Sequence, residues 1–170
     1  IKVTNKCNIE CSYCYENTNK KGDIMSIEVF YKIIEKAILS TSKQIITVIF
    51  HGGEPLLLPT EWYSKAINYC DNISSVYNKQ IFYGLQTNFV SVSDQKIYEL
   101  KKLGINISAS LDAGDLLNNE REFSNKTLEN LYRAKALSLN ISILSTINNT
   151  NYHSFIPFME FLYNKFGIIN

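Results

Sequence analysis

Three of the four cysteines in this 170-residue chain, Cys7, Cys11 and Cys14, lie within its first fifteen residues. Thiols this dense are rarely present for packing, and thiolates are the ligands that zinc and iron–sulfur clusters prefer. Three thiolates leave one iron of a [4Fe–4S] cluster without a protein ligand, whereas an electron-transfer cluster normally has four cysteines. The spacing therefore favours a cluster with one iron open to a substrate or cofactor.

A zinc site is the alternative interpretation of the same cysteines. It needs a fourth ligand, for which His51 and Cys70 are the only plausible donors. Zinc loops usually come as paired two-cysteine knuckles, and the sequence has no second pair. The clustered, unpaired cysteines also argue against disulfides and predict a reducing, cytoplasmic setting.

Composition excludes some classes of partner. The formal net charge is +1, with 19% charged and 45% hydrophobic residues, which suits one domain with a real core. We expect no nucleic-acid partner, and no membrane partner because no apolar run approaches the roughly 20 residues of a membrane span. The chain begins at Ile1 inside an expected strand, so we expect it to be a piece of a longer protein.

Hydrophobic periodicity predicts strands and helices in strict alternation. Helices are expected from Ser26, from Thr60, from Ser93 to Leu103, from Ser124 or Asn125 to about Leu139, and from Tyr152 to Phe166. Strands are expected at 1–5, 45–50, 81–87, 105–111 and 141–147, with a sixth cut off as it starts at 167–169. The alternation predicts right-handed βαβ crossovers, and hence an α/β fold with a parallel sheet.

The second strand has two features of its own. The β-branched run at 45–50 is typical of a strand that is buried on both faces. We expect the strand to end there, because His51-Gly52-Gly53-Glu54-Pro55 should not continue it. Periodicity alone does not decide whether the sheet is open or curled into a barrel.

Polar or glycine-rich residues follow four of the expected strands. In parallel α/β folds the carboxyl ends of the strands form the ligand-binding face. Four independent features should therefore meet on one face: Cys7–Cys14, Gly52–Pro55, Gln86 with Asn88, and Ser110 with Asp112.

Two of these motifs resemble a known family. Cys7-x3-Cys11-x2-Cys14, with Tyr13 before the last cysteine, and Gly52-Gly53-Glu54-Pro55 are similar to the signatures of radical S-adenosylmethionine (SAM) enzymes. Their flanking residues resemble the peptide- and protein-modifying branch, which includes sulfatase maturases and thioether-forming maturases. The resemblance spans the whole chain and implies one radical SAM core domain over 1–170, a (βα)n partial barrel truncated near strand six.

The resemblance also implies cofactors. A [4Fe–4S] cluster would sit on Cys7, Cys11 and Cys14, with SAM on its open iron. Gly52 and Gly53 would let the backbone approach the methionine part of SAM.

Further residues are candidate SAM contacts, each with an ordinary structural role as the alternative. Glu54, beside Pro55, would complement the SAM ammonium or be a helix-start carboxylate, and Tyr13 would meet the adenine or be a core tyrosine. Ser110 and Asp112 share a side of their strand and suit the ribose, while the amides of Gln86 and Asn88 would reach SAM or substrate. Arg121 would bind the SAM carboxylate or be an exposed arginine. The sequence indicates no catalytic base.

The chain departs from the family pattern at several positions. Phe89 replaces a common glycine, and Ala113-Gly114 replaces a common Gly-Pro, which affects the alignment of Arg121. No cysteine follows Cys70, so no auxiliary cluster can be assigned.

The function implied is reductive SAM cleavage to a 5′-deoxyadenosyl radical, which abstracts hydrogen from a peptide or protein. A flavodoxin or ferredoxin would be the reductant, and the isolated piece is not expected to turn over. A small-molecule or RNA substrate, or a non-enzymatic iron–sulfur or zinc module, remains an alternative.

Overall fold

The computed structural model describes residues 1–15, 22–113 and 123–167. Its strands are β1 (Lys2–Thr4), β2 (Ile45–Gly52), β3 (Gln80–Thr87), β4 (Ile105–Ser110) and β5 (Ser142–Leu144). Its α-helices are α1 (Ile27–Ser40), α2 (Thr60–Val76), α3 (Asp94–Lys102), α4 (Ser124–Ala136) and α5 (Phe155–Phe166), and short 3-10 turns span Pro55–Leu57 and Tyr152–Ser154. No helix in these ranges is long and apolar enough to cross a membrane.

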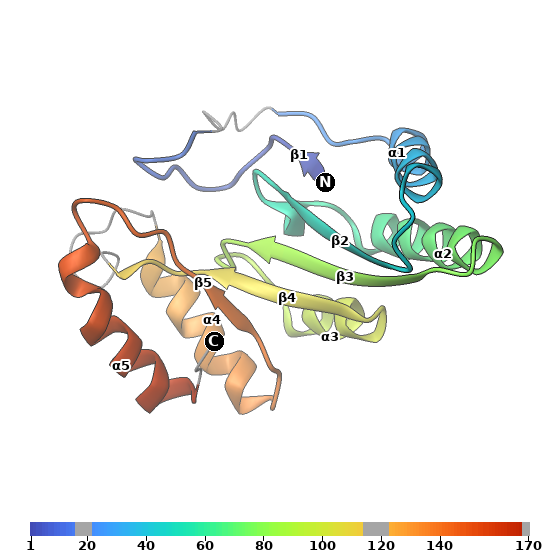
Figure 1. The fold of residues 1–170 in the computed structure, drawn as a ribbon. Coiled ribbons are helices and arrows are strands. Elements are labelled where there is room, and N and C mark those ends of the chain that lie inside the picture. Colours follow the sequence, from blue (N-terminus) through green and yellow to red (C-terminus); the bar gives the residue numbers. More distant parts are fainter. Residues whose placement is uncertain (16–21, 114–122, 168–170) are drawn as a thin grey trace.

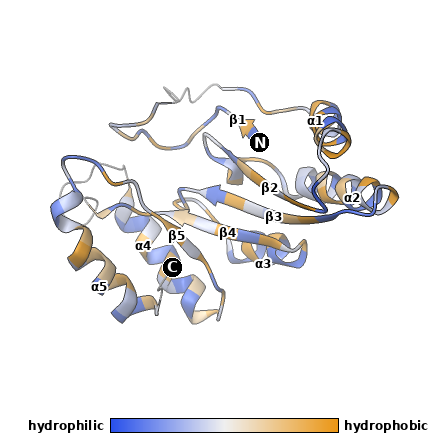
Figure 2. Ribbon diagram, viewed as in Figure 1, coloured by the Kyte–Doolittle hydropathy of each residue, from blue (hydrophilic) through white to orange (hydrophobic). Residues whose placement is uncertain are grey.

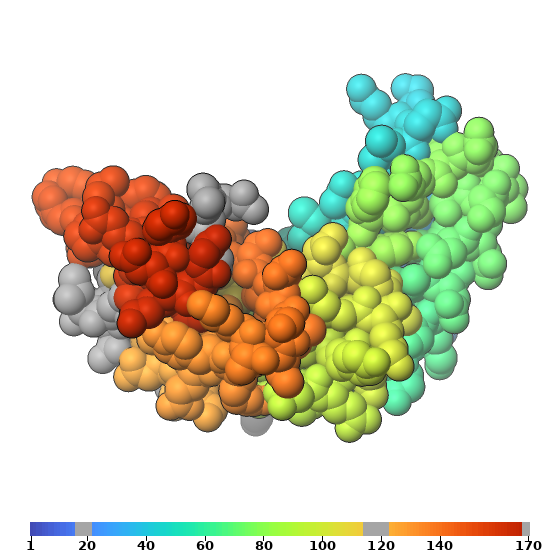
Figure 3. Space-filling view, turned by 90° about the horizontal axis from the view of Figure 1, so that it is seen from below, coloured from blue at the N-terminus to red at the C-terminus, as the bar shows by residue number. Residues whose placement is uncertain are grey.

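The sheet is parallel throughout and its strands follow one another in chain order, β1-β2-β3-β4-β5. A doubly wound sheet would reverse its order at a switch point, whereas sequential order is the winding of a (βα) barrel. The helices accordingly line the outside of a curved sheet (Figure 1), and the molecule has a crescent outline when viewed from below (Figure 3). The predicted parallel α/β partial barrel is confirmed.

The core lies between the outer face of the sheet and the helices. Each helix carries both hydrophobic and hydrophilic residues (Figure 2), as expected for helices that cover one face of a sheet. Within this core Phe50 of β2 packs edge-on against Trp62 and Tyr63 of α2, with ring centroids 6.0 and 5.2 Å apart. Phe30 of α1 joins this group, 5.2 Å from Trp62. These rings bind α1, α2 and β2 into one unit.

The prediction that β2 is buried on both faces is wrong. Val48 and Phe50 are buried, but Ile45 and Ile49 on the other face are 60% and 48% exposed. Successive side chains of a strand point to opposite faces, and helices cover only the outer one. The β-branched run thus reflects strand propensity more than two-sided burial.

Most element boundaries agree with expectation, and the exceptions have local causes. The Ser26 and Ser93 hydroxyls cap α1 and α3 as predicted, accepting hydrogen bonds from Val29 N and Lys96 N. Gly104 follows α3 with a φ of +72°, the conformation that favours glycine there. By contrast β2 continues through Gly52, because its end pairs with β1, and Pro59 rather than Thr60 is the N-cap of α2. Strand β5 is shorter than expected.

The sixth expected strand, at 167–169, falls almost wholly outside the described residues. Gly167 itself ends α5 in a left-handed conformation.

Truncation of Phe50 tests the position of the core. We expect Phe50→Ala to lower the free energy of unfolding by about 3–5 kcal/mol, because a fully buried ring is replaced by a cavity. Urea unfolding followed by circular dichroism measures the change. Ile49→Ala, next to it on the open face, is the matched control and should cost less than half as much. Equal losses at the two positions would contradict the one-sided core.

Candidate functional site

The cysteine loop is placed by backbone pairing that continues beyond β1. His51 N donates to Ile1 O at 3.0 Å, Gly53 N to Thr4 O at 2.8 Å, and Glu54 N to Lys6 O at 2.8 Å. The first six residues thus run alongside the end of β2. Cys7 follows directly, at the carboxyl edge of the sheet.

Gly52 and Gly53 make this pairing possible. A Cβ on Gly52 would lie 2.2 Å from Thr4 O, and one on Gly53 would lie 2.2 Å from Lys6 O. Gly52 also has a φ of +127°, which L side chains rarely adopt. We expected the glycines to let SAM approach the backbone. In the structure, their lack of a Cβ lets the backbone of residues 4–6 lie against them.

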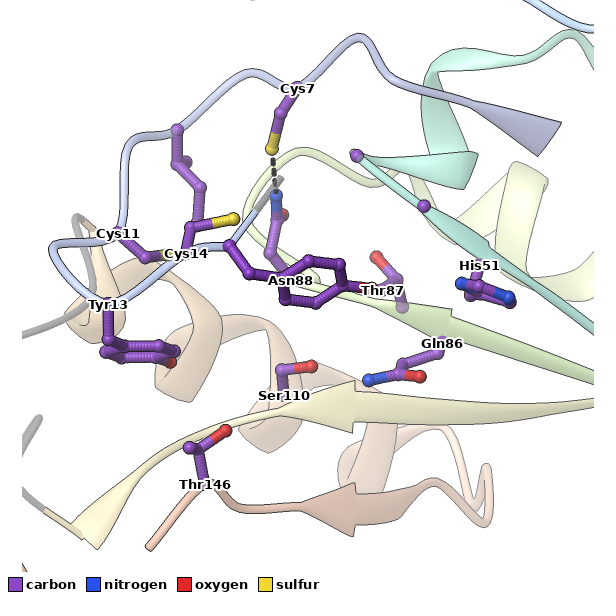
Figure 4. Close-up of a pocket in the computed structure, with 14 residues that line it drawn as sticks. Cys7, Cys11, Tyr13, Cys14, His51, Gln86, Thr87, Asn88, Ser110 and Thr146 are labelled. Atoms are coloured by element: carbon purple, nitrogen blue, oxygen red, sulfur yellow. Dashed lines mark hydrogen bonds between the residues drawn. The ribbon is translucent and has the colours of Figure 1, made fainter. Parts of the chain in front are cut away.

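A cavity of about 390 Å³ lies between the cysteine loop and the ends of β2, β3 and β4. Figure 4 shows the three cysteines on one side of it, with Gln86, Ser110 and Thr146 on the other. The predicted site residues that line it are Cys7, Cys11, Tyr13, Cys14, Gly52, Gly53, Gln86, Asn88 and Ser110. Glu54, Pro55 and Asp112 are not among the lining residues, and Arg121 lies outside the described residues.

The three cysteines differ in burial. Cys7 is 7% exposed, whereas Cys11 and Cys14 are half-buried on a turn closed by the hydrogen bond from Cys14 N to Cys11 O, at 3.0 Å. Burial raises the pKa of the Cys7 thiol, and the Glu54 charge adds to this, while hydrogen bonds from Ile9, Asn8 and Asn88 oppose it.

The donor set suits an iron–sulfur cluster. Among the described residues no three His, Cys, Asp or Glu side chains form a group that could hold a single metal ion. A [4Fe–4S] cluster makes no such demand, because each thiolate binds a different iron. Three soft thiol donors facing one cavity therefore fit that cluster. Cys70 does not line the cavity; it is buried in α2, where burial raises its pKa to about 12.

Glu54 has a different environment from the one expected. It is 1% exposed, and its Oε1 accepts hydrogen bonds from Leu56 N and Thr87 Oγ1, each at 2.7 Å. Its Oε2 accepts one from Asn88 N, also at 2.7 Å. Burial raises the pKa of Glu54, and these three donors and the Lys96 charge act against it. The carboxylate thus links the loops after β2 and β3, and does not face the cavity where SAM was expected.

Ser110 and Asp112 have different environments. Ser110 lines the cavity, but β4 ends there, so the strand alternation does not extend to Asp112. Asp112 is fully buried: Tyr13 Oη donates to its Oδ2, and Thr146 N donates to its Oδ1 at 2.6 Å. It therefore connects the cysteine loop to the segment after β5. Pro55 is also structural, since its carbonyl accepts from Tyr63 Oη at 2.8 Å.

The sequence did not single out some residues that line the cavity. His51, considered above only as a zinc ligand, lines the cavity, as do Ile9, Tyr15, Thr87 and Thr146, which were not singled out. Thr146 follows β5, so extending the strand-end rule to the fifth strand would have found it.

The family model for the radical SAM superfamily matches residues 1–162, and the chain belongs to that superfamily.

Relatives with similar sequences differ in their described activities. A protein of Methanocaldococcus jannaschii without an assigned function is 32% identical over 94% of this chain and 54% of its own length. A cysteine-type anaerobic sulfatase-maturating enzyme of Clostridium novyi is 26% identical over 89% of this chain and 44% of its own. A GTP 3′,8-cyclase of Clostridium botulinum is 34% identical over 66% of this chain and 34% of its own. The chain thus spans about half the length of the first two of these relatives, 54% and 44%.

A solved structure has the same fold. Native anSMEcpe, with bound AdoMet (SAM) and the Cp18Cys peptide, superposes with a TM-score of 0.79 at 20% identity. The match covers 96% of this chain and 46% of that one. It confirms the radical SAM core fold.

Gly53 tests how the cysteine loop is held. We expect Gly53→Ala to destabilise the protein by about 1–3 kcal/mol, because the new methyl group meets backbone that must shift. Gly84→Ala in β3 is the matched control, since its Cβ would make only ordinary contacts, the nearest with Ile49 Cγ1 at 3.5 Å. Chemical denaturation of both variants gives the two costs. Similar small costs would show that residues 4–6 do not press on Gly53.

Proposed function

We propose that this chain is the catalytic core of a radical SAM enzyme that uses a [4Fe–4S] cluster and SAM to take a hydrogen atom from a peptide or protein. The observation that carries the proposal is the sharing of one cavity by all three cysteines and by residues from the ends of β2, β3 and β4. Membership of the radical SAM superfamily supports it.

The roles of the residues follow from their positions. Cys7, Cys11 and Cys14 would hold the cluster, and Gln86 and Ser110 offer an amide and a hydroxyl to SAM across the cavity. Tyr13 is held by Asp112, which fixes its ring beside the same space. When bound, the cluster supplies one electron that breaks a carbon–sulfur bond of SAM to give the 5′-deoxyadenosyl radical. Contact of Arg121 with the SAM carboxylate, and reduction by a flavodoxin or ferredoxin in the cytoplasm, remain predictions.

The cysteines provide the first test. In the full-length protein, anaerobic reconstitution with iron and sulfide should give a [4Fe–4S] spectrum, and dithionite with SAM should then yield 5′-deoxyadenosine. Replacing Cys7, Cys11 or Cys14 by alanine should abolish both signals, because each thiolate binds one iron.

Cys70→Ala is the matched control and should retain both signals, since that thiol is buried in α2 away from the cavity. Zinc binding without SAM cleavage in the wild-type protein would refute the proposal.

The substrate class needs a test of its own. The peptide or protein assignment is supported by the sulfatase-maturating relative and by the peptide bound to anSMEcpe, while the GTP cyclase relative favours a small molecule. We expect deuterium to pass into 5′-deoxyadenosine from a peptide whose cysteine is deuterated at Cβ. Mass spectrometry of the 5′-deoxyadenosine detects it. Transfer from deuterated GTP, with none from peptide, would favour the second function.

A further inference from the structure

The side chain of Asn88 lies between the loop after β3 and the first cysteine. Its Nδ2 is 3.8 Å from Cys7 Sγ, within hydrogen-bond range for sulfur, and 2.7 Å from Asn8 Oδ1. Figure 4 shows this amide directed at the Cys7 sulfur from the strand side of the cavity. The two N–H groups of the amide thus have two acceptors, one of which is the sulfur.

Neighbouring hydrogen bonds fix the orientation of this amide. Asn88 Oδ1 accepts from Val90 N at 2.9 Å, so reversing the amide would lose that bond and place oxygen against Asn8 Oδ1. The backbone is held as well: Asn88 N donates to Glu54 Oε2 at 2.7 Å, and Thr127 Oγ1 donates to Asn88 O at 2.7 Å. Asn88 is 6% exposed, so water competes little for these groups.

This placement differs from the SAM or substrate contact expected of Asn88. Both amide protons are directed at residues of the cysteine loop, one at Cys7 Sγ and one at Asn8 Oδ1. The Asn88 amide therefore donates to Cys7, one of the three proposed cluster ligands.

We propose that Asn88 is a positioning residue that raises the reduction potential of the iron–sulfur cluster by donating an N–H to the sulfur of Cys7. The proposal rests on the proposed function, because it requires that Cys7 bind the cluster. Reduction adds one electron to the cluster, and the added negative charge is shared with the ligand sulfurs. A donor at sulfur stabilises this reduced form more than the oxidised one, which is how hydrogen bonds to sulfur set cluster potentials. The hydrogen bonds with Val90 N and Asn8 Oδ1 hold the amide donor in its orientation.

The test is the midpoint potential of the cluster, followed by electron paramagnetic resonance in a redox titration without SAM. In the full-length, reconstituted protein, Asn88→Ala removes the donor without adding charge. We expect the equilibrium constant for reduction to fall about tenfold, which is about 59 mV for one electron. Asn88→Asp keeps an oxygen for Val90 N but sets a negative oxygen towards the sulfur, so its shift should be larger.

Thr127→Val is the matched control. It removes the bond to Asn88 O and loosens the same loop, yet it leaves the amide donor, so the potential should stay near that of the wild type. Unchanged potentials in both Asn88 variants would overturn the proposal, as would an equal shift in Thr127→Val. Loss of the cluster from both Asn88 variants, with the cluster retained in Thr127→Val, would also overturn the proposal. Asn88 would then be needed to keep the cluster bound, not to set its reduction potential. Absence of any cluster from the wild-type protein would instead refute the proposed function itself.

Discussion

The site depends on one close approach, that of the backbone of Thr4–Lys6 to Gly52 and Gly53. A Cβ at either glycine would lie 2.2 Å from a carbonyl oxygen of this segment. Their absence lets Gly53 N and Glu54 N donate to Thr4 O and Lys6 O. Two motifs some forty-five residues apart in sequence are thereby one structural unit. The glycines decide where the cysteine loop begins, and any ligand in the cavity meets a loop already fixed on that side.

Glu54 extends this constraint to the next strand. Burying a carboxylate is costly unless its oxygens are hydrogen-bonded, and here two backbone N–H groups and the Thr87 hydroxyl satisfy them. The carboxylate thereby joins the loop after β2 to the loop after β3, which carries Asn88. Cys7 is thus held from two sides, by pairing along the end of β2 and by the Asn88 amide. Its low exposure, compared with half-buried Cys11 and Cys14, agrees with this double restraint.

The fold and the location of the site were predictable because they follow from periodicity and spacing. Alternating strands and helices required a parallel sheet, and the strand-end rule brought Cys7, Gln86 and Ser110 to one edge. The role of each side chain at that edge depends on contacts between segments distant in sequence, and motif spacing does not predict those contacts. Glu54 has the sequence position of a ligand contact but bonds to Thr87, thirty-three residues away.

Two further predictions, for Asp112 and for the run at 45–50, relied on local strand geometry and differ from the structure. Strand alternation assigned Asp112 to the ribose beside Ser110, but β4 ends at Ser110, and Asp112 is fully buried and bonded to Tyr13 and Thr146. The run at 45–50 suggested burial on both faces, yet no sequence pattern tells how many faces of a strand the helices cover.

The outer face of the sheet carries the hydrophobic core, and the inner face carries residues that line the cavity. On β2, Val48 and Phe50 point to the helices and are buried, while Ile49 lies over Gly84 on the inner face and remains half exposed. Along the same inner face, Gln86 and Ser110 stand at the carboxyl ends and line the cavity. Substitutions on the inner face therefore leave the outer core largely intact. The backbone pairing that places the cysteine loop along β2 does not depend on the side chains of Gln86 and Ser110. Function resides in sites carried by a fold and not in the fold itself, in keeping with relatives described as a sulfatase-maturating enzyme and a GTP cyclase.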